Sequence, residues 1–416
     1  MYKITKFGGA SIKDDEGVRN LKKILEVFKN EKLIVIISAM GKMTNQLEKI
    51  LDSWYYYPDS LINNFDIVKN YHLDIAKKLE TFNGEITSVL LPILDRLLEI
   101  ISSVNSNNYD KDYDNIVSFG EYLSTKLIST YLNLNGYKNE FACAIHLIKT
   151  DDSFREGKVN WKETEKEIRN FVSKNSTKTI ITQGFIGGTD RNEVTTLGRE
   201  GSDFSAAIFA YCLNAKDVTI WKDVPGLLNA DPKFFPGATK LEKISYQEAI
   251  ELAYYGATII HPKTIKPLQN KNIPLFVKSF LDPCAEGSMI ADFKPIAKTP
   301  SFIFKTDQIL LSIFPKDFSF IAADNLTKIF SFISNNKLKI NLMQNSAVSF
   351  TICIDNKSNR FSNLLKDLQE EFVVKYNMNK KLITIRHYTP EAIKQVIGKQ
   401  HIILEQKSRT TLQVVV

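Results

Sequence analysis

Five consecutive apolar residues, Leu33-Ile34-Val35-Ile36-Ile37, set the first limit on the architecture of this chain. Such a run is typical of a buried strand in a parallel sheet. Residues 2–7 predict a short strand before it, and the acidic residues 14–16 begin the helix between the two strands. This strand–helix–strand order predicts an α/β fold with a central, mostly parallel sheet covered by helices.

Further strand patterns extend the predicted sheet. They lie at residues 179–182, 217–221 and 273–277, and each is followed by a turn marked by glycine or proline. Residues 59–105 carry few strand signals and many helical spacings, so we expect a helical insertion there.

A change of pattern divides the chain into two regions. Residues 286–300 combine prolines and a glycine with little periodicity, which indicates a linker. We therefore expect one α/β domain at residues 1–285 and a second region at residues 301–416.

The second region has its own element order. Residues 301–378 predict a βαββαβ unit, and residues 379–416 begin a similar unit that stops after βαββ. The second unit is therefore incomplete, either truncated or completed by another segment. Two similar units in tandem form a weak internal repeat.

Composition excludes several classes of protein. The 416 residues are 44% hydrophobic and 24% charged, which is the balance of a globular protein with a full core and excludes disorder. No apolar run approaches the roughly 18 residues of a membrane helix, and no signal peptide is visible. The four cysteines form no C-x-x-C and the five histidines no zinc pattern. We expect a cytoplasmic protein.

The net charge of +7 raises nucleic acid as a partner, but the charge is unevenly distributed. Residues 1–296 carry 37 Lys and Arg against 38 Asp and Glu, whereas residues 297–416 carry 17 against 9. The excess therefore lies in the second region, and no nucleic-acid motif accompanies it. We interpret it as a solvated surface.

Two glycine loops have the composition of phosphate or carboxylate sites. Lys6, Gly8 and Gly9 bring bare backbone N–H groups and one positive charge to the end of a strand, which suits phosphate. In the segment 197–203, Arg199 lies between glycines and can bind a carboxylate or phosphate with two hydrogen bonds. An ordinary strand–helix turn, and a helix N-cap at residue 202 or 203, remain alternatives.

Three more polar segments follow predicted strands or begin helices. Residues 38–45 contain the hydroxyls of Ser38 and Thr44, and residues 118–121 contain the acidic residue Glu121. Residues 222–232 contain the Lys222-Asp223 pair. Polar groups at the carboxyl edge of a parallel sheet are where open α/β folds bind ligands. A helix cap at Thr44, a favourable helix-dipole position for Glu121 and a solvated loop are the alternative explanations.

Taken in order, these motifs resemble one known family. KFGGAS, SAMGKMTN, SFGEYLS, TLGREGSD, KDVPGLLNADP and GATIIHPKTIKP are similar to the aspartokinases of the amino-acid kinase family. NLMQNSAVSFTICID and LITIRHYTPEAI resemble the tandem ACT regulatory domains of the same enzymes. The resemblance covers essentially the whole chain. It implies an ATP- and Mg²⁺-dependent kinase that converts L-aspartate to 4-phospho-L-aspartate, on the route to lysine, threonine and methionine.

The resemblance also implies roles for individual residues. The residues expected to act on phosphate and ATP are Lys6, Gly8, Gly9, Asp203, Lys222, Asp223, Asp231 and Lys263, with Lys6 and Asp203 as the catalytic pair. Those expected to bind aspartate are Ser38, Thr44, Glu121 for the ammonium, Arg199 for the α-carboxylate, and Ser202. Because the β-carboxylate is already an anion at neutral pH, no general base is required. His261 is expected to be structural.

Several positions depart from the family pattern. They are Ala10, Glu200, Lys222, Leu228 and Thr258, where the family has respectively Thr, Gly, Thr, Tyr and, in many relatives, a phosphate-contacting Lys. Lys222 or Lys263 could supply the missing charge. Two alternatives therefore remain open, which are a kinase of glutamate-like substrates and an amino-acid-binding regulator with a degenerate kinase domain.

The resemblance further implies feedback regulation. Asn341 and Ser346 match effector-binding positions of the first ACT unit. Because Asn is neutral where relatives often carry Asp, the effector is left open, with lysine and threonine as candidates. Since ACT units usually pair between chains, we expect a homodimer, with neither nucleic acid nor membrane as a partner.

Overall fold

The computed structural model describes residues 1–80, 84–257, 260–293, 299–317 and 319–416. The chain forms two compact units, and we describe each by itself. The N-terminal unit comprises Met1–Leu227, Lys240–Ile250 and Ile259–Lys294, and the C-terminal unit comprises Leu228–Thr239, Glu251–Thr258 and Pro295–Val416. Within the described residues, no helix is long and apolar enough to cross a membrane.

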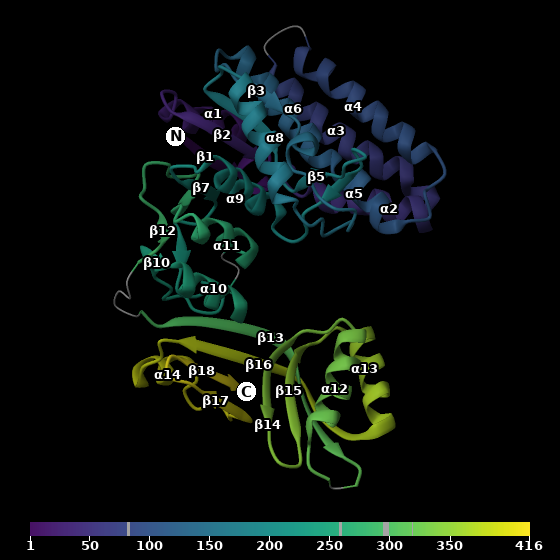
Figure 1. Ribbon diagram of the computed structural model, residues 1–416, viewed down its shortest axis with the longest axis vertical. Helices are drawn as coiled ribbons and strands as arrows, with labels where there is room; N and C mark the ends of the chain where they lie inside the picture. The colour runs from purple at the N-terminus through teal and green to yellow at the C-terminus, as the bar shows by residue number, and fades with distance from the viewer. Residues whose placement is uncertain (81–83, 258–259, 294–298, 318) are drawn as a thin grey trace. The chain divides into compact units, whose positions relative to one another are not determined.

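The N-terminal unit is built on an eight-stranded sheet (Figure 1). Its strands, in spatial order, are β10 (Lys243–Ser245), β12 (Ser288–Ala291), β11 (Leu275–Ser279), β7 (Val218–Lys222), β1 (Tyr2–Phe7), β2 (Lys32–Ile37), β4 (Thr179–Gln183) and β3 (Glu140–Ala142). All neighbouring strands are parallel except β11 and β12. The predicted α/β fold with a mostly parallel sheet is confirmed.

Helices cover both faces of this sheet. They are α1 (Asp15–Val27), α2 (Met43–Tyr56), α3 (Leu61–Leu79), α4 (Glu85–Ser102), α5 (Tyr109–Val117), α6 (Phe119–Leu134), α7 (Ala144–Leu147), α8 (Trp161–Lys174), α9 (Gly201–Leu213), α10 (Tyr246–Tyr255) and α11 (Pro262–Asn270). Short elements complete the list: the 3₁₀ turns at Gly9–Ile12 and Pro58–Ser60, the pair β5 (Ile186–Gly188) and β6 (Val194–Thr196), and the pair β8 (Leu227–Leu228) and β9 (Lys240–Leu241).

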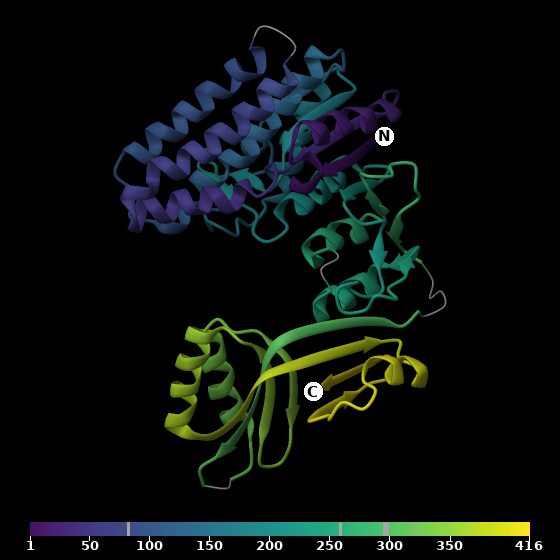
Figure 2. The same cartoon turned by 180° about the vertical axis from the view of Figure 1, so that it is seen from behind.

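The apolar run in β2 explains why the sheet needs two helical layers. Leu33, Val35 and Ile37 pack into the core formed with α1–α6, whereas Ile34 and Ile36 pack into the core formed with α8, α9 and α11. Successive side chains of a strand point to opposite faces, so all five are buried. The expected helical insertion is present as α3 and α4, the long helices in Figure 2.

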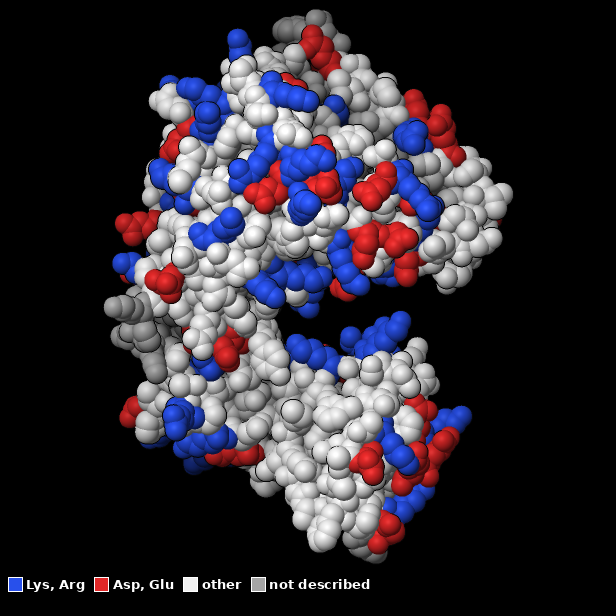
Figure 3. Space-filling view, in the orientation of Figure 1, with Lys and Arg blue, Asp and Glu red and all other residues white. Residues whose placement is uncertain are grey.

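The C-terminal unit contains a six-stranded antiparallel sheet in the order β14-β15-β13-β16-β18-β17. Its elements are β13 (Ser301–Pro315), α12 (Ala323–Asn335), β14 (Ile340–Asn345), β15 (Phe350–Asp355), α13 (Ser358–Glu371), β16 (Phe372–Arg386), α14 (Pro390–Val396), β17 (Leu404–Lys407) and β18 (Thr411–Val415). On the face seen in Figure 3, basic and acidic side chains alternate around α12 and α13, as expected for a solvated surface.

The structure shows how the incomplete second ACT-like unit is finished. β16 is one continuous strand whose first half pairs with residues 308–315 of β13 and whose second half, Leu382–Arg386, pairs with residues 301–305. The start of β13 therefore supplies the missing strand to β16, α14, β17 and β18. This additional strand favours completion by another segment over truncation.

Some predicted boundaries were wrong. The expected linker at 286–300 contains β12, which pairs with β10 and β11, while residues 294–298 lie outside the described residues. Helix α9 begins at Gly201 with Glu200 at the N-cap, not at Ser202 or Asp203, and no side chain caps it. Helix α2 likewise has Lys42 and not Thr44 at its N-cap. The pattern of residues 318–334 predicts a helix, but α12 begins at Ala323, and residue 318 lies outside the described residues.

Candidate active site

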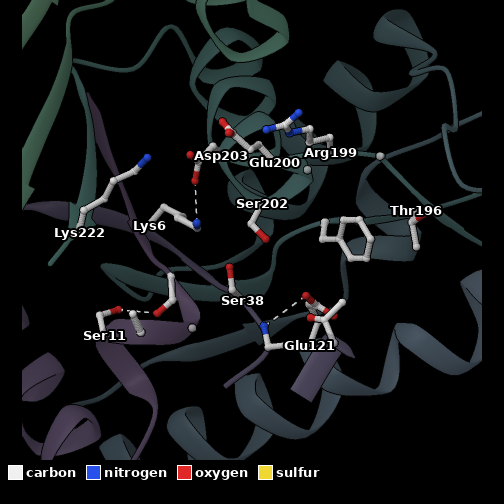
Figure 4. A pocket seen from close by; sticks show the side chains of 18 of the residues that line it. Lys6, Ser11, Ser38, Glu121, Thr196, Arg199, Glu200, Ser202, Asp203 and Lys222 are labelled. Carbon is white, nitrogen blue, oxygen red and sulfur yellow. Dashed lines mark hydrogen bonds and ion pairs between the residues drawn. The ribbon is translucent and has the colours of Figure 1, made fainter. Parts of the chain in front are cut away.

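A cavity of about 660 Å³ opens in the N-terminal unit where β1, β2 and β7 end. Ligand sites of open α/β sheets lie at this edge. Eleven sequence-predicted residues line it together: Lys6, Gly8, Gly9, Ser38, Thr44, Glu121, Arg199, Ser202, Asp203, Lys222 and Asp223. Five separate motifs, spread over more than 200 residues of sequence, therefore converge on one cavity (Figure 4).

Lys6 and Asp203 form the central ion pair of the cavity. The Nζ of Lys6, on β1, lies 2.6 Å from Oδ1 of Asp203, which stands in the first turn of α9 and is 3% exposed. Burial alone would raise the pKa of Asp203, but the positive charges of Lys6 and Lys222 outweigh it and lower that pKa. Figure 4 shows Lys222 reaching toward the same carboxylate from the end of β7. Two lysines thus share one carboxylate, which leaves excess positive charge for an anionic ligand.

The glycines after β1 allow two loops to approach closely. A Cβ on Gly9 would lie 2.7 Å from the carbonyl oxygens of Ala39 and Gly41, so no other residue fits there without movement. The Gly41 N–H donates to the Gly9 carbonyl (3.0 Å), and the Ser11 hydroxyl donates to the Gly8 carbonyl (2.6 Å). The loops after β1 and β2 are therefore fixed together beneath Lys6.

Glu121 is a buried carboxylate with one unpaired oxygen. It is 2% exposed in the first turn of α6, and its Oε1 accepts the Ala39 N–H at 3.2 Å. Gly120 makes this approach possible, because a Cβ there would lie 2.8 Å from the Ala39 Cβ. Within the part of the chain that the structure describes, Oε2 has no hydrogen-bond partner. Burial raises the pKa of Glu121 to about 8, despite the opposing effects of the Ala39 N–H and of Lys6.

Arg199 lies on a loop held in left-handed conformations. Gly198 has φ +74° and Glu200 has φ +54°, a region in which side chains other than glycine are strained. Oε2 of Glu200 accepts the backbone N–H of His261 at 2.9 Å, which ties the loop to the start of α11. This contact accounts for Glu200 at a position where the family pattern has Gly.

His261 has a structural place, as expected. It is the N-cap of α11, and its Nδ1 accepts the Lys263 N–H at 3.2 Å. Burial lowers its pKa. It does not line the cavity.

Two residues predicted for the ATP site lie outside the cavity lining. Asp231 belongs to the C-terminal unit, where its Oδ1 accepts the Lys233 N–H within its own turn. The ammonium of Lys263 lies 3.7 Å from Glu156, which itself lines the cavity. Lys263 therefore contacts a residue of the cavity wall, Glu156, but does not line the cavity itself. Thr258 lies outside the described residues.

The cavity also contains residues that the sequence did not single out. They are Ser11, Ala39, Gly41, Tyr113, Arg155, Glu156, Phe185, Thr196, Gly198, Gly201, Trp221 and Phe280, with Ala10 and Glu200 noted only as departures from the family pattern. Thr196 is the first residue of the TLGREGSD motif, but the sequence assigned it no role. Arg155 and Tyr113 belong to segments without a glycine loop, and only the fold brings them to the site.

The two predicted effector positions lie apart in the C-terminal unit. Asn341 accepts a hydrogen bond from Lys305 (2.7 Å) and donates to Gln308 (2.8 Å) and Asp355 (2.7 Å). Ser346 follows the far end of β14, where its hydroxyl lies 2.7 Å from that of Ser349. Five residues along a strand separate them by roughly 16 Å. The two positions therefore lie near opposite ends of β14.

Comparisons with known proteins agree with this geometry. The sequence model described as the Amino acid kinase family matches residues 1–279. Aspartokinase 2 of Arabidopsis thaliana, a chloroplastic protein, is 29% identical over 92% of this chain and 73% of its own length. Aspartokinase 3 of the same plant is 31% identical over 85% of this chain and 64% of its own length.

Solved structures share the fold of the whole chain. Escherichia coli aspartokinase III, in complex with lysine and aspartate (T-state) or with aspartate and ADP (R-state), matches with a TM-score of 0.84 in both cases. Each comparison covers 100% of this chain and 96% of the other, at 24% identity.

Proposed function

This chain belongs to the amino acid kinase family, and we propose that it is an aspartate kinase, which transfers the γ-phosphoryl group of ATP to the β-carboxylate of L-aspartate. One observation carries the proposal. The cavity combines an unpaired buried carboxylate oxygen on Glu121, the guanidinium of Arg199 and the paired lysines at Asp203. These groups match, in turn, an ammonium, an α-carboxylate and a phosphate.

The reaction needs positioning more than proton transfer. The β-carboxylate has an ordinary pKa of about 3.9 and attacks as an anion. A bond forms between its oxygen and the γ-phosphorus, the bond to the ADP oxygen breaks, and ADP leaves with the electron pair. The main obstacle is repulsion between the carboxylate and the triphosphate. Lys6 and Lys222 reduce it, and the short side chains of Ser38, Thr44 and Ser202 orient aspartate between Glu121 and Arg199.

A divalent cation, which we propose is Mg²⁺, fits the site as a companion of ATP. Over the described ranges, no group of three or more His, Cys, Asp or Glu side chains is placed to hold a metal. The carboxylates near the phosphate end are Asp203, which is paired with Lys6, and Asp223. Such a donor set suits a cation held largely by phosphate oxygens. When bound, the cation neutralises part of the negative charge of the phosphates.

A panel of acceptors tests the substrate. Purified protein with ATP and MgCl₂ should form an acyl phosphate from L-aspartate, which hydroxylamine traps as the hydroxamate. The rate of hydroxamate formation from L-glutamate or N-acetyl-L-glutamate should be lower by at least about 100-fold. A preference for glutamate would identify a related kinase. Absence of product and of ATP binding from a folded protein that binds amino acids would identify a regulator with a degenerate kinase domain.

We also propose feedback inhibition by an amino acid, with Asn341 and Ser346 at effector sites of a homodimer formed through the C-terminal unit. β14 is an edge strand of the sheet, so one side of its backbone is available for a second chain. Asn341 and Ser346 lie near the two ends of this strand. Lysine and threonine are the candidate effectors.

Lys305 offers a test of the effector site. An effector ammonium that binds Asn341 must displace the Lys305 ammonium from Oδ1. K305M should therefore strengthen inhibition by lysine about tenfold, the equivalent of one charge-assisted hydrogen bond of about 1.5 kcal/mol. Inhibition curves measure this, with K316M as the control, because Lys316 binds the Glu370 carbonyl on the surface. Equal inhibition of K305M and wild type would exclude Asn341 from effector binding.

A further inference from the structure

A carboxylate behind the cavity wall has no place in the chemistry proposed above. Asp114 lies on α5 and is fully buried. Its Oδ2 accepts the backbone N–H groups of Arg155 (2.9 Å) and Thr196 (2.8 Å), and its Oδ1 accepts the Thr196 hydroxyl (2.7 Å). The Asp114 side chain therefore joins its own helix to the segments around Arg155 and Thr196, which lie 41 and 82 residues further along the chain.

Both segments that Asp114 holds form the cavity wall. Arg155 and Thr196 line the cavity, and the Gly157 N–H donates to the Thr196 carbonyl at 2.8 Å. Thr196 ends β6 and precedes Arg199 by three residues. A displacement of Thr196 would therefore move the guanidinium that is proposed to bind the substrate.

The backbone at Arg155 shows that this contact holds a strained conformation. Its φ of +67° is one that residues other than glycine rarely adopt. Such a conformation persists only when its surroundings determine it. Three contacts determine the conformation of Arg155. The Asp114 carboxylate accepts its backbone N–H, and its guanidinium carbon lies 4.2 Å from the centre of the Tyr113 ring. Its Nη1 atom lies 3.3 Å from Oδ1 of Asp110.

We propose that Asp114 is a positioning residue for the acceptor substrate, whose carboxylate fixes the 154–157 segment and the end of β6 so that Arg199 meets the α-carboxylate of aspartate. This inference rests on the proposed aspartate kinase activity. Asp114 touches no reacting atom. Its effect should therefore appear in the KM for aspartate and not in the KM for ATP.

Two substitutions separate geometry from charge. D114A removes all three acceptor contacts and should raise the KM for aspartate about 10- to 100-fold, because small displacements of a clamp cost that much. The KM for ATP should stay within about twofold. D114N can offer its carbonyl oxygen to both N–H groups and donate its NH₂ to the Thr196 hydroxyl, which can rotate to accept. It should restore the KM for aspartate to within about threefold of wild type.

Asp112 provides a matched control on the same helix. It is 3% exposed and also accepts three hydrogen bonds, from the Tyr55 hydroxyl (2.7 Å) and from the N–H (2.9 Å) and hydroxyl (2.8 Å) of Ser106. Neither Asp112 nor its partners line the cavity. D112A should lower the melting temperature as D114A does, but leave the KM for aspartate within about twofold.

Hydrogen exchange gives a readout that does not depend on activity. D114A should lose amide protection at residues 154–157 and 195–199, D112A should not, and T196V, which removes one of the three donors, should show a smaller loss. T196V also serves if D114A does not fold. An unchanged KM in D114A, or an equal rise in D112A, would overturn the proposal. If wild type phosphorylates no aspartate while the exchange pattern holds, the proposed function fails and the structural clamp stands.

Discussion

K6M is expected to lower kcat by about 100- to 1,000-fold while the protein remains folded. Lys6 is the cation closest to Asp203, and its ammonium offsets the repulsion between two anionic reactants. Removal of one preorganised electrostatic partner typically costs about 100- to 1,000-fold in kcat. Loss of Lys6 also leaves Asp203 short of a charge partner in a buried position, so we expect the free energy of unfolding to fall by about 3 kcal/mol. Steady-state kinetics and thermal melts measure the two effects.

Lys3 supplies the control on the same strand. Its ammonium also pairs with carboxylates, Asp217 at 3.5 Å and Glu31 at 3.7 Å, but lies at the other end of β1. K3M should lose stability and keep kcat within about twofold of wild type. If K6M retained more than about a tenth of the wild-type kcat, Lys6 would have no part in phosphoryl transfer.

E121Q is expected to raise the KM for aspartate about 100-fold, because a buried carboxylate paired with an ammonium is worth several kcal/mol relative to a neutral amide. The unpaired Oε2 of Glu121 is the group that the substrate ammonium satisfies. The KM for ATP should change little, because Lys6, Lys222 and the glycine loops are untouched. Titration of aspartate into the nucleotide-free protein measures the same loss directly.

The pH dependence follows from the raised pKa. In the free protein the Glu121 carboxyl has a pKa of about 8 and is largely neutral below that pH. Binding of an ammonium below pH 8 must expel this proton, so kcat/KM for aspartate should rise up to tenfold per pH unit and level off above about pH 8. E121Q should abolish this rise. D217N, which removes another buried carboxyl with a raised pKa outside the cavity, should keep it.

The Glu121 carboxyl should also make the stability of the folded protein depend on pH, but this contribution falls as the pH rises. A pKa raised from 4.5 to about 8 means that the folded state binds the proton more tightly than the unfolded state. The resulting stability is fully present below pH 4.5 and is lost as the pH rises through about 8. E121Q should therefore melt at a higher temperature than wild type at pH 9, and this advantage should shrink toward pH 5.

A KM for aspartate unchanged in E121Q would exclude Glu121 from substrate binding.

Much of the site could be predicted because it lies in local patterns. Lys6, Gly8, Gly9 and Arg199 belong to glycine loops beside strands, and the position of a strand end in a parallel sheet is set by the chain order. The apolar run of β2 identified a doubly covered sheet for the same reason. Such features depend on neighbours within about ten residues.

What escaped prediction depends on distant contacts. Asp114 and Thr196 are 82 residues apart, and only the packing of α5 against β6 brings them together. The sequence placed a boundary between two units at residues 378 and 379, yet β16 continues across it and pairs with β13 on both sides. Glu200 departs from the family pattern, and its role depends on a residue 61 positions away, because its carboxylate accepts a hydrogen bond from the His261 N–H.

The most direct test uses L-aspartate labelled with ¹⁸O in the β-carboxylate, incubated with ATP, MgCl₂ and hydroxylamine. If the β-carboxylate oxygen attacks the γ-phosphorus, that oxygen becomes the bridge of the acyl phosphate. Hydroxylamine then attacks the carbonyl carbon and expels the bridge oxygen with the phosphate. Mass spectrometry should therefore find one ¹⁸O in each released phosphate, in equal amount to the hydroxamate. Release of unlabelled phosphate, with no hydroxamate, would contradict phosphoryl transfer to aspartate.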